Sequence, residues 1–394
     1  MADLKSTSTI PAINLDLFSD AALQDPYPHY RRLRDLGAVV RLEPLGMYAL
    51  SRFAGVREAL SKWEVFSNAQ GVAMNDETNS KIKGTTLGSD PPLHTQLRHI
   101  LAQPLVPSAM QEVTRLIERE AQAIVDRCCD RGTFDVATEL ATHLPVSIIS
   151  HLVGLPEAGR ERMLQWGVAA FNTMGPENER CQAAKSIGFG LIEYMLKLDP
   201  TQLAPGSWGA LCMEAARRGD ITPQQAIGLL FDYTAPSLDT TILAITSAVW
   251  LFALHPNQWD VVRGQIGLLP AAINEILRLE SPIQVFSRYV TRDVEIDGVT
   301  LPAHSRALVM YGSANRDERK WEDPQHFDIR RKAAEQLAFG YGSHQCVGLP
   351  LARLEMRAII AALAARVSRF EIIGSRRLLN NTLRGLQSLA VRVQ

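Results

Sequence analysis

The sequence predicts a mostly α-helical protein with small β-sheets, organised as a single folded unit. Residues 107–197 follow a helical pattern with few breaks, and residues 222–255 form a second helical run that is mostly apolar. Short β-like segments lie toward both ends of the chain, at 39–52, 289–317 and 369–393. We therefore expect one domain over residues 13–394, preceded by a tail over residues 1–12.

The composition is that of an ordinary globular protein, with 46% hydrophobic and 21% charged residues. The net charge of −1 gives no field that would attract nucleic acid or a membrane surface. No uninterrupted apolar stretch reaches the length of a transmembrane helix, and the polar N-terminus lacks the apolar core of a secretory signal. Five cysteines, an odd number, indicate a reducing compartment. We expect a cytoplasmic monomer with no nucleic-acid or membrane partner.

The first part of the chain predicts two helices, a hairpin and a long irregular stretch. A short helix follows Pro26 and stops at Gly37, a hairpin turns around residues 44–46, and an amphipathic helix follows. Residues 66–88 are punctuated by glycine, asparagine and aspartate, and so long a loop is often a pocket lid. Lys81 lies in this stretch, where it either faces a pocket or is simply solvated.

Two sets of candidate ligand contacts follow. His94 and Arg98 are four residues apart and so share a helix face, where two cationic or donor groups suit an anion such as a carboxylate. A solvated helix face fits the same spacing. Phe171 and Met174 flank a predicted helix break at 175–176, and they are either core residues or the lining of a pocket.

The longest predicted helix covers residues 222–255. A threonine cap and a first-turn proline open it, and a helix so apolar on all sides should cross the interior. Its middle breaks this pattern, because Pro236 has no N–H for the helical bond and Asp239 and Thr240 are polar. An acid beside an alcohol at such an opening could hold water and dioxygen. A proline kink with back-bonding hydroxyls explains the kink but not the acid.

Residues 339–348, with the sequence FGYGSHQCVG, are the most specific stretch of the chain. Cys346 lies in a glycine-rich loop directly before a helical run, where backbone N–H groups and the positive helix end stabilise a thiolate. Gly340 and its neighbouring glycines would let a large flat group approach the backbone. A buried free cysteine is the ordinary alternative. We favour a thiolate bound to haem iron.

Together these features resemble the bacterial cytochrome P450 monooxygenases over the chain from about residue 13. The F-x-x-G-x-x-x-C-x-G pattern occupies residues 339–348, and the E-x-x-R pattern falls on Glu275 and Arg278. The long helix carries D-T-T at 239–241, and H-T-Q-L-R follows a D-P-P turn within residues 90–98. The resemblance implies the cytochrome P450 fold, in which a long central helix lies over a haem beside a β-rich subdomain.

The resemblance also implies a role for each motif. Cys346 would be the axial thiolate of haem b, and Asp239 with Thr240 would relay protons while O2 is activated. Pro236 and Ser237 stand where the family usually has Ala-Gly, which puts the groove of the long helix in question. The expected haem contacts are His94, Arg98, Arg288, Phe339, Gly340 and His344, and the residues expected to hold the haem loop are Glu275, Arg278 and Arg331.

The stretches AAFNTMGPEN, ESPIQVFSR, YGSANRD and NNTLRGLQSL are similar to the branch that demethylates para-methoxybenzoate. This implies O-demethylation of a small methoxybenzoate or methoxyphenol. That branch anchors a carboxylate. Here Lys81 stands at an anchoring position and could pair with one, whereas Asp232 would repel it or favour a donor such as a phenol. The candidate substrate contacts are Lys81, Phe171, Met174, Asp232, Pro236, Ile283, Val285 and Phe286.

The resemblance further implies that electrons come from NAD(P)H through a reductase and a small iron–sulfur ferredoxin. The ferredoxin would dock on the cysteine side, near Arg353 and His99. The alternatives are a P450 that hydroxylates a terpene or fatty acid, a peroxide-driven enzyme, and a non-catalytic haem sensor. The acid–alcohol pair argues against the peroxide-driven enzyme, and the near-neutral charge argues against a sensor that binds DNA.

Overall fold

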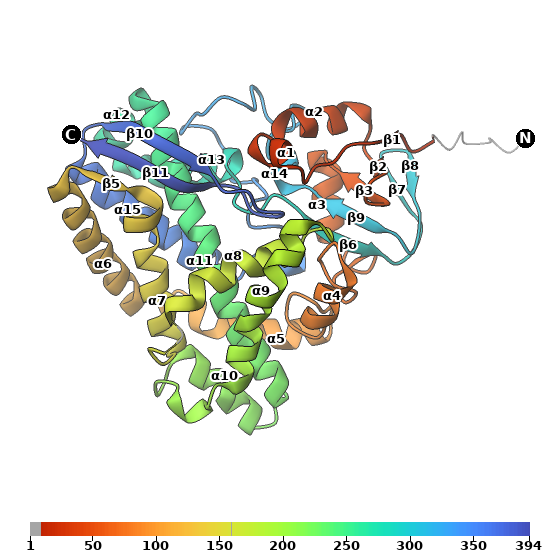
Figure 1. Cartoon of the computed structure of the whole chain (residues 1–394), viewed down its shortest axis with the longest axis horizontal. Coiled ribbons are helices and arrows are strands. Elements are labelled where there is room, and N and C mark those ends of the chain that lie inside the picture. The colour runs from red at the N-terminus through yellow and green to blue at the C-terminus, as the bar shows by residue number, and fades with distance from the viewer. Residues whose placement is uncertain (1–8, 159) are drawn as a thin grey trace, which may run out of the picture.

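Helices form most of the protein, and the larger β-sheet lies beside them near the N-terminal end (Figure 1). The computed structural model describes residues 9–158 and 160–394, so residues 1–8 of the predicted tail lie outside the described part. The α-helices are α1 (Asp20–Gln24), α2 (Tyr27–Leu36), α3 (Phe53–Ser61), α4 (Asp76–Ile82), α5 (Leu93–Ala102), α6 (Met110–Arg131), α7 (His143–Val153), α8 (Met163–Thr173), α9 (Glu179–Lys197), α10 (Trp208–Arg217), α11 (Pro223–Leu254), α12 (Pro256–Gly264), α13 (Leu269–Leu279), α14 (Tyr311–Ala314) and α15 (Leu349–Arg366).

The strands form one mixed sheet and two small antiparallel ones. The predicted hairpin is present as β2 (Val40–Leu42) paired antiparallel with β3 (Met47–Leu50). The larger sheet has the order β1-β2-β3-β9-β6-β4, and the smaller ones are β10-β11-β5 and β7-β8. The remaining strands are β1 (Ala12–Ile13), β4 (Phe66–Ser67), β5 (Thr133–Asp135), β6 (Phe286–Val290), β7 (Val294–Ile296), β8 (Val299–Leu301), β9 (Arg306–Val309), β10 (Phe370–Arg377) and β11 (Leu386–Val393).

Helix α11 crosses the interior, as its sequence predicts (Figure 1). A capping box starts it: the Thr222 hydroxyl accepts from the Gln225 backbone at 3.1 Å, and the Gln225 side chain accepts from the Thr222 backbone at 2.8 Å. By length and composition this helix and the stretch Val136–Val153 could each cross a membrane, but 72% and 61% of their apolar windows are buried inside the protein. Helix α11 packs against α7, α8 and α15, and α7 packs against α11, α6 and α10, so core packing accounts for the apolar surface of both stretches.

Several local predictions were wrong. The stretch predicted as irregular contains β4 and α4, because Asn75 caps a helix by accepting from the Thr78 backbone instead of interrupting the chain. The sequence suggests Ser89 or Asp90 as the cap of the next helix, but α5 begins after Pro92 without a side-chain cap, and Asp90 accepts from the Asn68 backbone at 2.9 Å. Strand β5 occupies one of the expected breaks in the long helical region, whereas α14 ends a segment predicted to be β-like.

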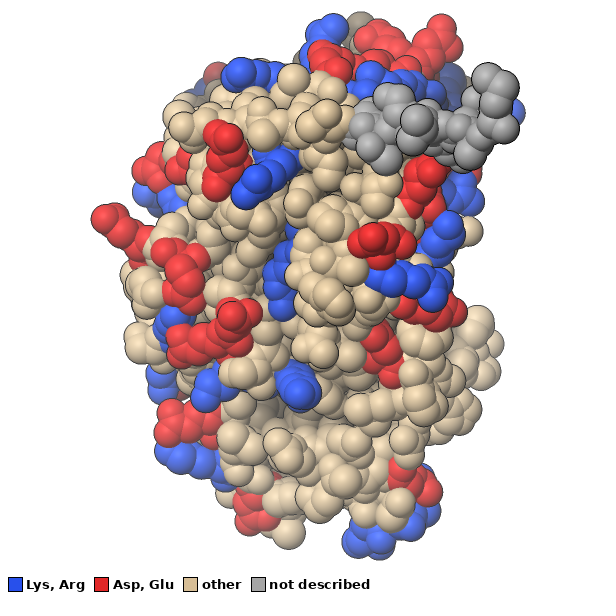
Figure 2. Space-filling view, turned by 90° about the vertical axis from the view of Figure 1, so that its right-hand side faces the viewer, with Lys and Arg blue, Asp and Glu red and all other residues tan. Residues whose placement is uncertain are grey.

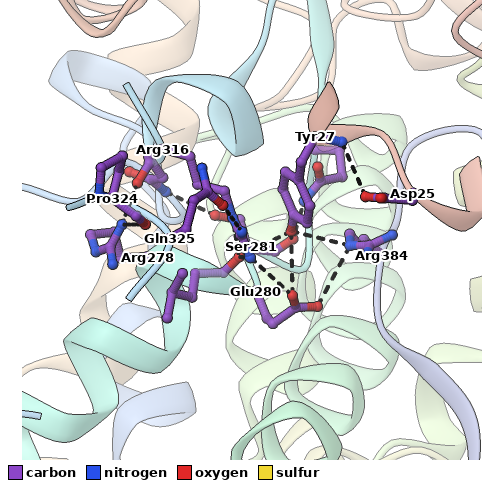
Figure 3. A network of polar contacts seen from close by, with 12 residues as sticks. Asp25, Tyr27, Arg278, Glu280, Ser281, Arg316, Pro324, Gln325 and Arg384 are labelled. Atoms are coloured by element: carbon purple, nitrogen blue, oxygen red, sulfur yellow. Dashed lines mark hydrogen bonds and ion pairs between the residues drawn. The ribbon is translucent and has the colours of Figure 1, made fainter. Parts of the chain in front are cut away.

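Glu280, directly after α13, is the centre of a buried charge cluster (Figure 3). Its carboxylate pairs with Arg377 at 2.8 Å, Arg316 at 3.2 Å and Arg384 at 3.5 Å. The guanidinium of Arg316 lies 3.5 Å from the centroid of the Tyr27 ring, and Arg384 Nε donates to the Tyr27 hydroxyl at 3.1 Å. Burial raises the pKa of Glu280, but the three arginines outweigh it and leave that pKa below its usual value.

Charges of both signs are scattered over the surface that Figure 2 shows, which is the right-hand side of Figure 1. Lysine and arginine side chains are interspersed there with aspartate and glutamate side chains. Such a mixture on this face is in line with the net charge of −1 and offers no broad basic surface for a polyanion. The absence of a nucleic-acid partner stays a prediction.

Candidate active site

The cysteine loop is held in a tight turn between the β-rich region and α15. Gly340 and Gly342 adopt φ angles of 70° and 74°, which suit glycine. A Cβ on Gly342 would come within 2.5 Å of the Leu60 carbonyl, so this position has no room for a side chain. The Cys346 backbone donates to the Phe339 carbonyl at 2.8 Å and closes the loop. Cys346 is exposed, but toward an internal cavity that it lines.

Two opposing effects act on the Cys346 thiol. Burial is the larger effect and raises the pKa of Cys346 above its usual value, although the backbone N–H groups of Gly348 and Leu349 and the charge of Arg98 act to lower that pKa. These donors and this cation would support the thiolate, which is the form that binds a metal. The loop thus presents one soft sulfur ligand at the floor of the cavity.

The cavity has a volume of about 240 Å³ and lies between α11 and the cysteine loop. It is lined mainly by apolar groups, together with a few charged ones. Lys81, Val285 and Asp239 are not among the described residues that line it. The predicted site residues that do line it are His94, Arg98, Phe171, Met174, Asp232, Pro236, Thr240, Ile283, Phe286, Arg288, Phe339, Gly340, His344 and Cys346.

Basic side chains gather at one part of the lining. The rings of His94 and His344 have centroids 3.9 Å apart, and the Nε2 atom of each is buried without a hydrogen-bond partner in the described part of the chain. Burial, and then the charge of Arg288, lowers the pKa of His344 far below its usual value, and His94 and Arg98 act in the same direction. A cluster short of negative charge fits a ligand that brings carboxylates.

These residues fit haem b. In the described part of the chain, no three His, Cys, Asp or Glu side chains lie together as a metal site. A metal ion in this cavity would therefore be held mainly by a cofactor, with one ligand from the protein. Cys346 would supply that ligand, and the basic cluster would bind the carboxylates of the group. Gly348 leaves the sulfur accessible, because even a Cβ built on it would lie 3.7 Å from Sγ. Phe339 and Gly340 line the same region, as predicted.

Across the cavity, the structure separates the predicted acid–alcohol pair on α11. Thr240 lines the cavity, and its hydroxyl donates to the Pro236 carbonyl at 2.7 Å. Asp239 is buried against α8 instead, where a Cβ on Gly167 would lie 2.2 Å from its Oδ2 atom. That oxygen has no hydrogen-bond partner among the described residues, and burial raises the pKa of Asp239 well above its usual value. The proton relay stays a prediction, with Asp239 behind the cavity wall.

Asp232 lies two helical turns earlier on α11 and does line the cavity. Its Oδ2 atom accepts from the Thr86 backbone at 3.3 Å. Burial raises the pKa of Asp232 to about 6, against the lowering effects of the Thr86 hydrogen bonds and the charge of Arg98. Thr86 lies in the stretch 66–88, which was predicted to be irregular, and its contact with Asp232 was not predicted.

Glu275, Arg278 and Arg331 form the network that the sequence predicts. Glu275 and Arg278 are fully buried and make two hydrogen bonds, at 2.7 and 2.8 Å, in a side-by-side pair. Arg331 Nε donates to the same carboxylate at 3.1 Å. Arg278 also donates to the carbonyls of Asn315 and Pro324, so the network joins α13 to the segment that precedes the cysteine loop.

Two predicted substrate contacts lie elsewhere. Lys81 is in the last turn of α4, with its Nζ atom 5.6 Å from the centroid of the Phe189 ring. Val285 belongs to a different hydrophobic cluster from Ile283 and Phe286 and lines a separate small pocket. Residues 283–285 precede β6, which begins at Phe286.

The sequence analysis missed Glu355, a buried acid that lines the cavity from α15. Burial raises the pKa of Glu355 to about 8. It follows Leu351 and Ala352 at helical spacing, and all three line the cavity. A lone glutamate on the otherwise apolar face after Cys346 was the available signal.

Comparisons with known proteins agree with this geometry. The family described as cytochrome P450 matches residues 237–377. Cytochrome P450 CYP199A2 of Rhodopseudomonas palustris is 36% identical over 390 residues, which cover 98% of this chain and 95% of that protein. Cytochrome P450 monooxygenase PikC of Streptomyces venezuelae is 29% identical, with 98% and 95% covered. The crystal structure of CYP109B1 from Bacillus subtilis matches with a TM-score of 0.78 at 26% identity, covering 94% of this chain and 100% of that one.

The motifs, the sulfur-floored cavity and these full-length relatives lead to one assignment. The match to CYP199A2 spans nearly the whole of both chains, which includes every element that surrounds the cavity. The chain belongs to the bacterial cytochrome P450 family, as a monooxygenase that uses haem b, O2 and electrons delivered from NAD(P)H by redox partners.

Proposed function

We propose that this P450 O-demethylates a small methoxylated aromatic compound. The observation that carries the proposal is the lining of the cavity opposite Cys346. Phe171, Met174, Ile283 and Phe286 come from α8, the turn after it, and the approach to β6, and they surround the space with apolar and flat surfaces. A confined apolar cavity of this kind suits a single aromatic ring.

The chain's residues would bind and orient the ring, exclude water and deliver protons. The haem supplies oxygen activation: one atom of O2 enters a C–H bond of the methoxy group and the other leaves as water, with two electrons from NAD(P)H. The hydroxymethyl ether that forms releases formaldehyde and leaves a phenol. Thr240 faces this chemistry with its hydroxyl, and Asp239 holds a proton behind it.

We propose an iron–sulfur ferredoxin as the electron donor, docked on the cysteine side of the protein. Arg353 on α15 is half-buried, lies 5.7 Å from the Phe339 ring centroid and donates to Asn274 at 2.6 Å, so it would act mainly by holding the loop. His99 is exposed at the end of α5 and is the freer contact. We also propose that the protein acts in the cytoplasm as a monomer.

The test combines the purified haem protein with a ferredoxin, its reductase and NADH. We expect 4-methoxybenzoate or 4-methoxyphenol to be consumed with one formaldehyde released per molecule. A haem spectrum that shifts with a terpene or fatty acid, and with none of the methoxyaromatics, would refute the aromatic substrate class. Faster turnover with peroxide alone than with the ferredoxin system would refute the proposed electron donor.

A further inference from the structure

Two carboxylates line the cavity among the described residues, and only one of them lies on α11. Glu355 comes from α15, on the side of Cys346, whereas Asp232 comes from the helix across the cavity. Phe231 and Pro236 flank Asp232 in the same lining. An acid in an otherwise apolar wall costs free energy unless something binds to it. Asp232 therefore needs an explanation beyond packing.

The acceptor capacity of Asp232 is partly unused. Thr86 is its hydrogen-bond donor, with the backbone N–H 3.3 Å from Oδ2, and the charge of Arg98 also acts on the carboxylate. A carboxylate has room for about four hydrogen bonds. Pro236, four residues later, has no N–H, so the backbone carbonyl of Asp232 also loses its helical partner.

In the described part of the lining, the arginines that could pair with a negatively charged substrate belong to the basic cluster. Arg98 belongs to the basic cluster that fits the carboxylates of haem. Lys81, which the sequence suggested as a partner for a substrate carboxylate, is not part of the described lining. A benzoate beside Asp232 would thus meet a like charge, whereas a hydroxyl group would meet a free acceptor.

We propose that Asp232 binds the substrate by accepting a hydrogen bond from a phenolic hydroxyl, and so selects methoxyphenols over methoxybenzoates. The choice of methoxylated substrates rests on the proposed O-demethylation. The hydrogen bond between Asp232 and a phenolic hydroxyl does not depend on it. A hydrogen bond to a carboxylate is stronger than one to a neutral group, and it orients the ring from the end opposite the reacting carbon.

The test is a set of equilibrium titrations of the haem protein, read from the haem spectrum. The ligands are 4-methoxyphenol, 1,4-dimethoxybenzene and 4-methoxybenzoate, together with 4-methylphenol and toluene as a pair without a methoxy group. We expect each phenol to bind about 10- to 100-fold more tightly than its partner without a hydroxyl, and the benzoate to bind more weakly than 4-methoxyphenol. Asp232→Asn should reduce the phenol preference to a few-fold and improve benzoate binding.

The control is Asp220→Asn, which removes an exposed acid just before the same helix and should leave every ratio unchanged. Tighter benzoate than phenol binding in the unmodified protein, or an unchanged phenol preference in Asp232→Asn, would overturn the inference. If Asp232→Asn fails to fold, the affinity ratios of the unmodified protein for the phenols, their partners without a hydroxyl and the benzoate test the inference by themselves. A preference kept for 4-methylphenol over toluene, with no methoxyaromatic binding, would sustain the role of Asp232 and refute the O-demethylation.

Discussion

Asp232 and Asp239 are seven residues apart on α11, so an ideal helix would turn both carboxylates to nearly the same side. Only Asp232 lines the cavity. Asp239 lies farther along the helix, where α8 covers it and Gly167 leaves just enough space for its carboxylate. The covering element, more than helical phase, therefore decides which acid lines the cavity. We propose that Asp232 acts in binding and Asp239 in proton supply.

The largest effect should come from Asp239→Asn. If Asp239 supplies protons, turnover with NADH and ferredoxin should fall at least about 100-fold, while substrate-induced haem shifts keep their midpoints. Asp232→Asn should show the reverse, with altered binding and little change in the maximal turnover of 1,4-dimethoxybenzene. Equal losses of binding in both variants would break the distinction between the two acids.

Asp239 and Glu275 are both buried acids, but Glu275 is paired with two arginines, whereas the Oδ2 atom of Asp239 has no hydrogen-bond partner among the described residues. Glu275→Gln would leave the buried Arg278 without a counter-charge and should cost about 3–5 kcal/mol of unfolding free energy, measured by urea titration. Glu371→Gln, which breaks an exposed pair with Arg392, is the matched control and should cost less than about 1 kcal/mol. Similar losses in the two variants would show that the Glu275 network does not hold the haem loop.

Asp239 should make the stability of the protein depend on pH. Because folding raises the pKa of Asp239, the folded protein keeps a proton that the unfolded chain releases, and stability falls as pH rises above the usual range of an aspartate. Asp239→Asn should remove this loss, so its melting temperature should exceed that of the wild type more at pH 8 than at pH 5. A variant that is less stable at both pH values would mean that Asp239 has a partner in solution.

Gly167 tests whether the position of Asp239 matters. Gly167→Ala would place a methyl group 2.2 Å from Oδ2, and the carboxylate must rotate away. Because alanine also favours the helix, stability should change by less than about 1 kcal/mol while turnover falls about tenfold. In Gly188→Ala the new methyl group meets backbone atoms of 169–170 at 3.0 Å, so this control should lose stability and keep its turnover.

The smallest effect concerns the charge of Asp232. Its pKa of about 6 means that phenol affinity should rise about fivefold between pH 5 and 7.5, as the acceptor becomes a carboxylate. Arg98 is the charged neighbour in this range. Burial raises the pKa of Cys212 to about 12 and that of Tyr233 further still, which keeps both neutral. Toluene affinity is the internal control, and a parallel rise for toluene would exclude Asp232 as the titrating group.

The sequence predicted best where a short motif controls both backbone and chemistry. The cysteine loop, the Glu275–Arg278 pair and the capped start of α11 were all predicted, because glycine, spacing and capping act locally. What lines the cavity depends on segments distant in sequence. The resemblance implied substrate contacts for Lys81 and Val285 and a proton relay for Asp239, but none of the three is among the described residues that line the cavity. Glu355 was missed for the same reason.

The Glu280 cluster joins Tyr27 to Arg384 across 357 residues of sequence (Figure 3). Bringing two residues so far apart in sequence together costs conformational entropy, and this cost is small only once most of the chain has folded. We therefore expect this contact to form late. The first and last parts of the chain then share one opening event, and amide protons of α2 and of the segment around Arg384 should lose protection from exchange together.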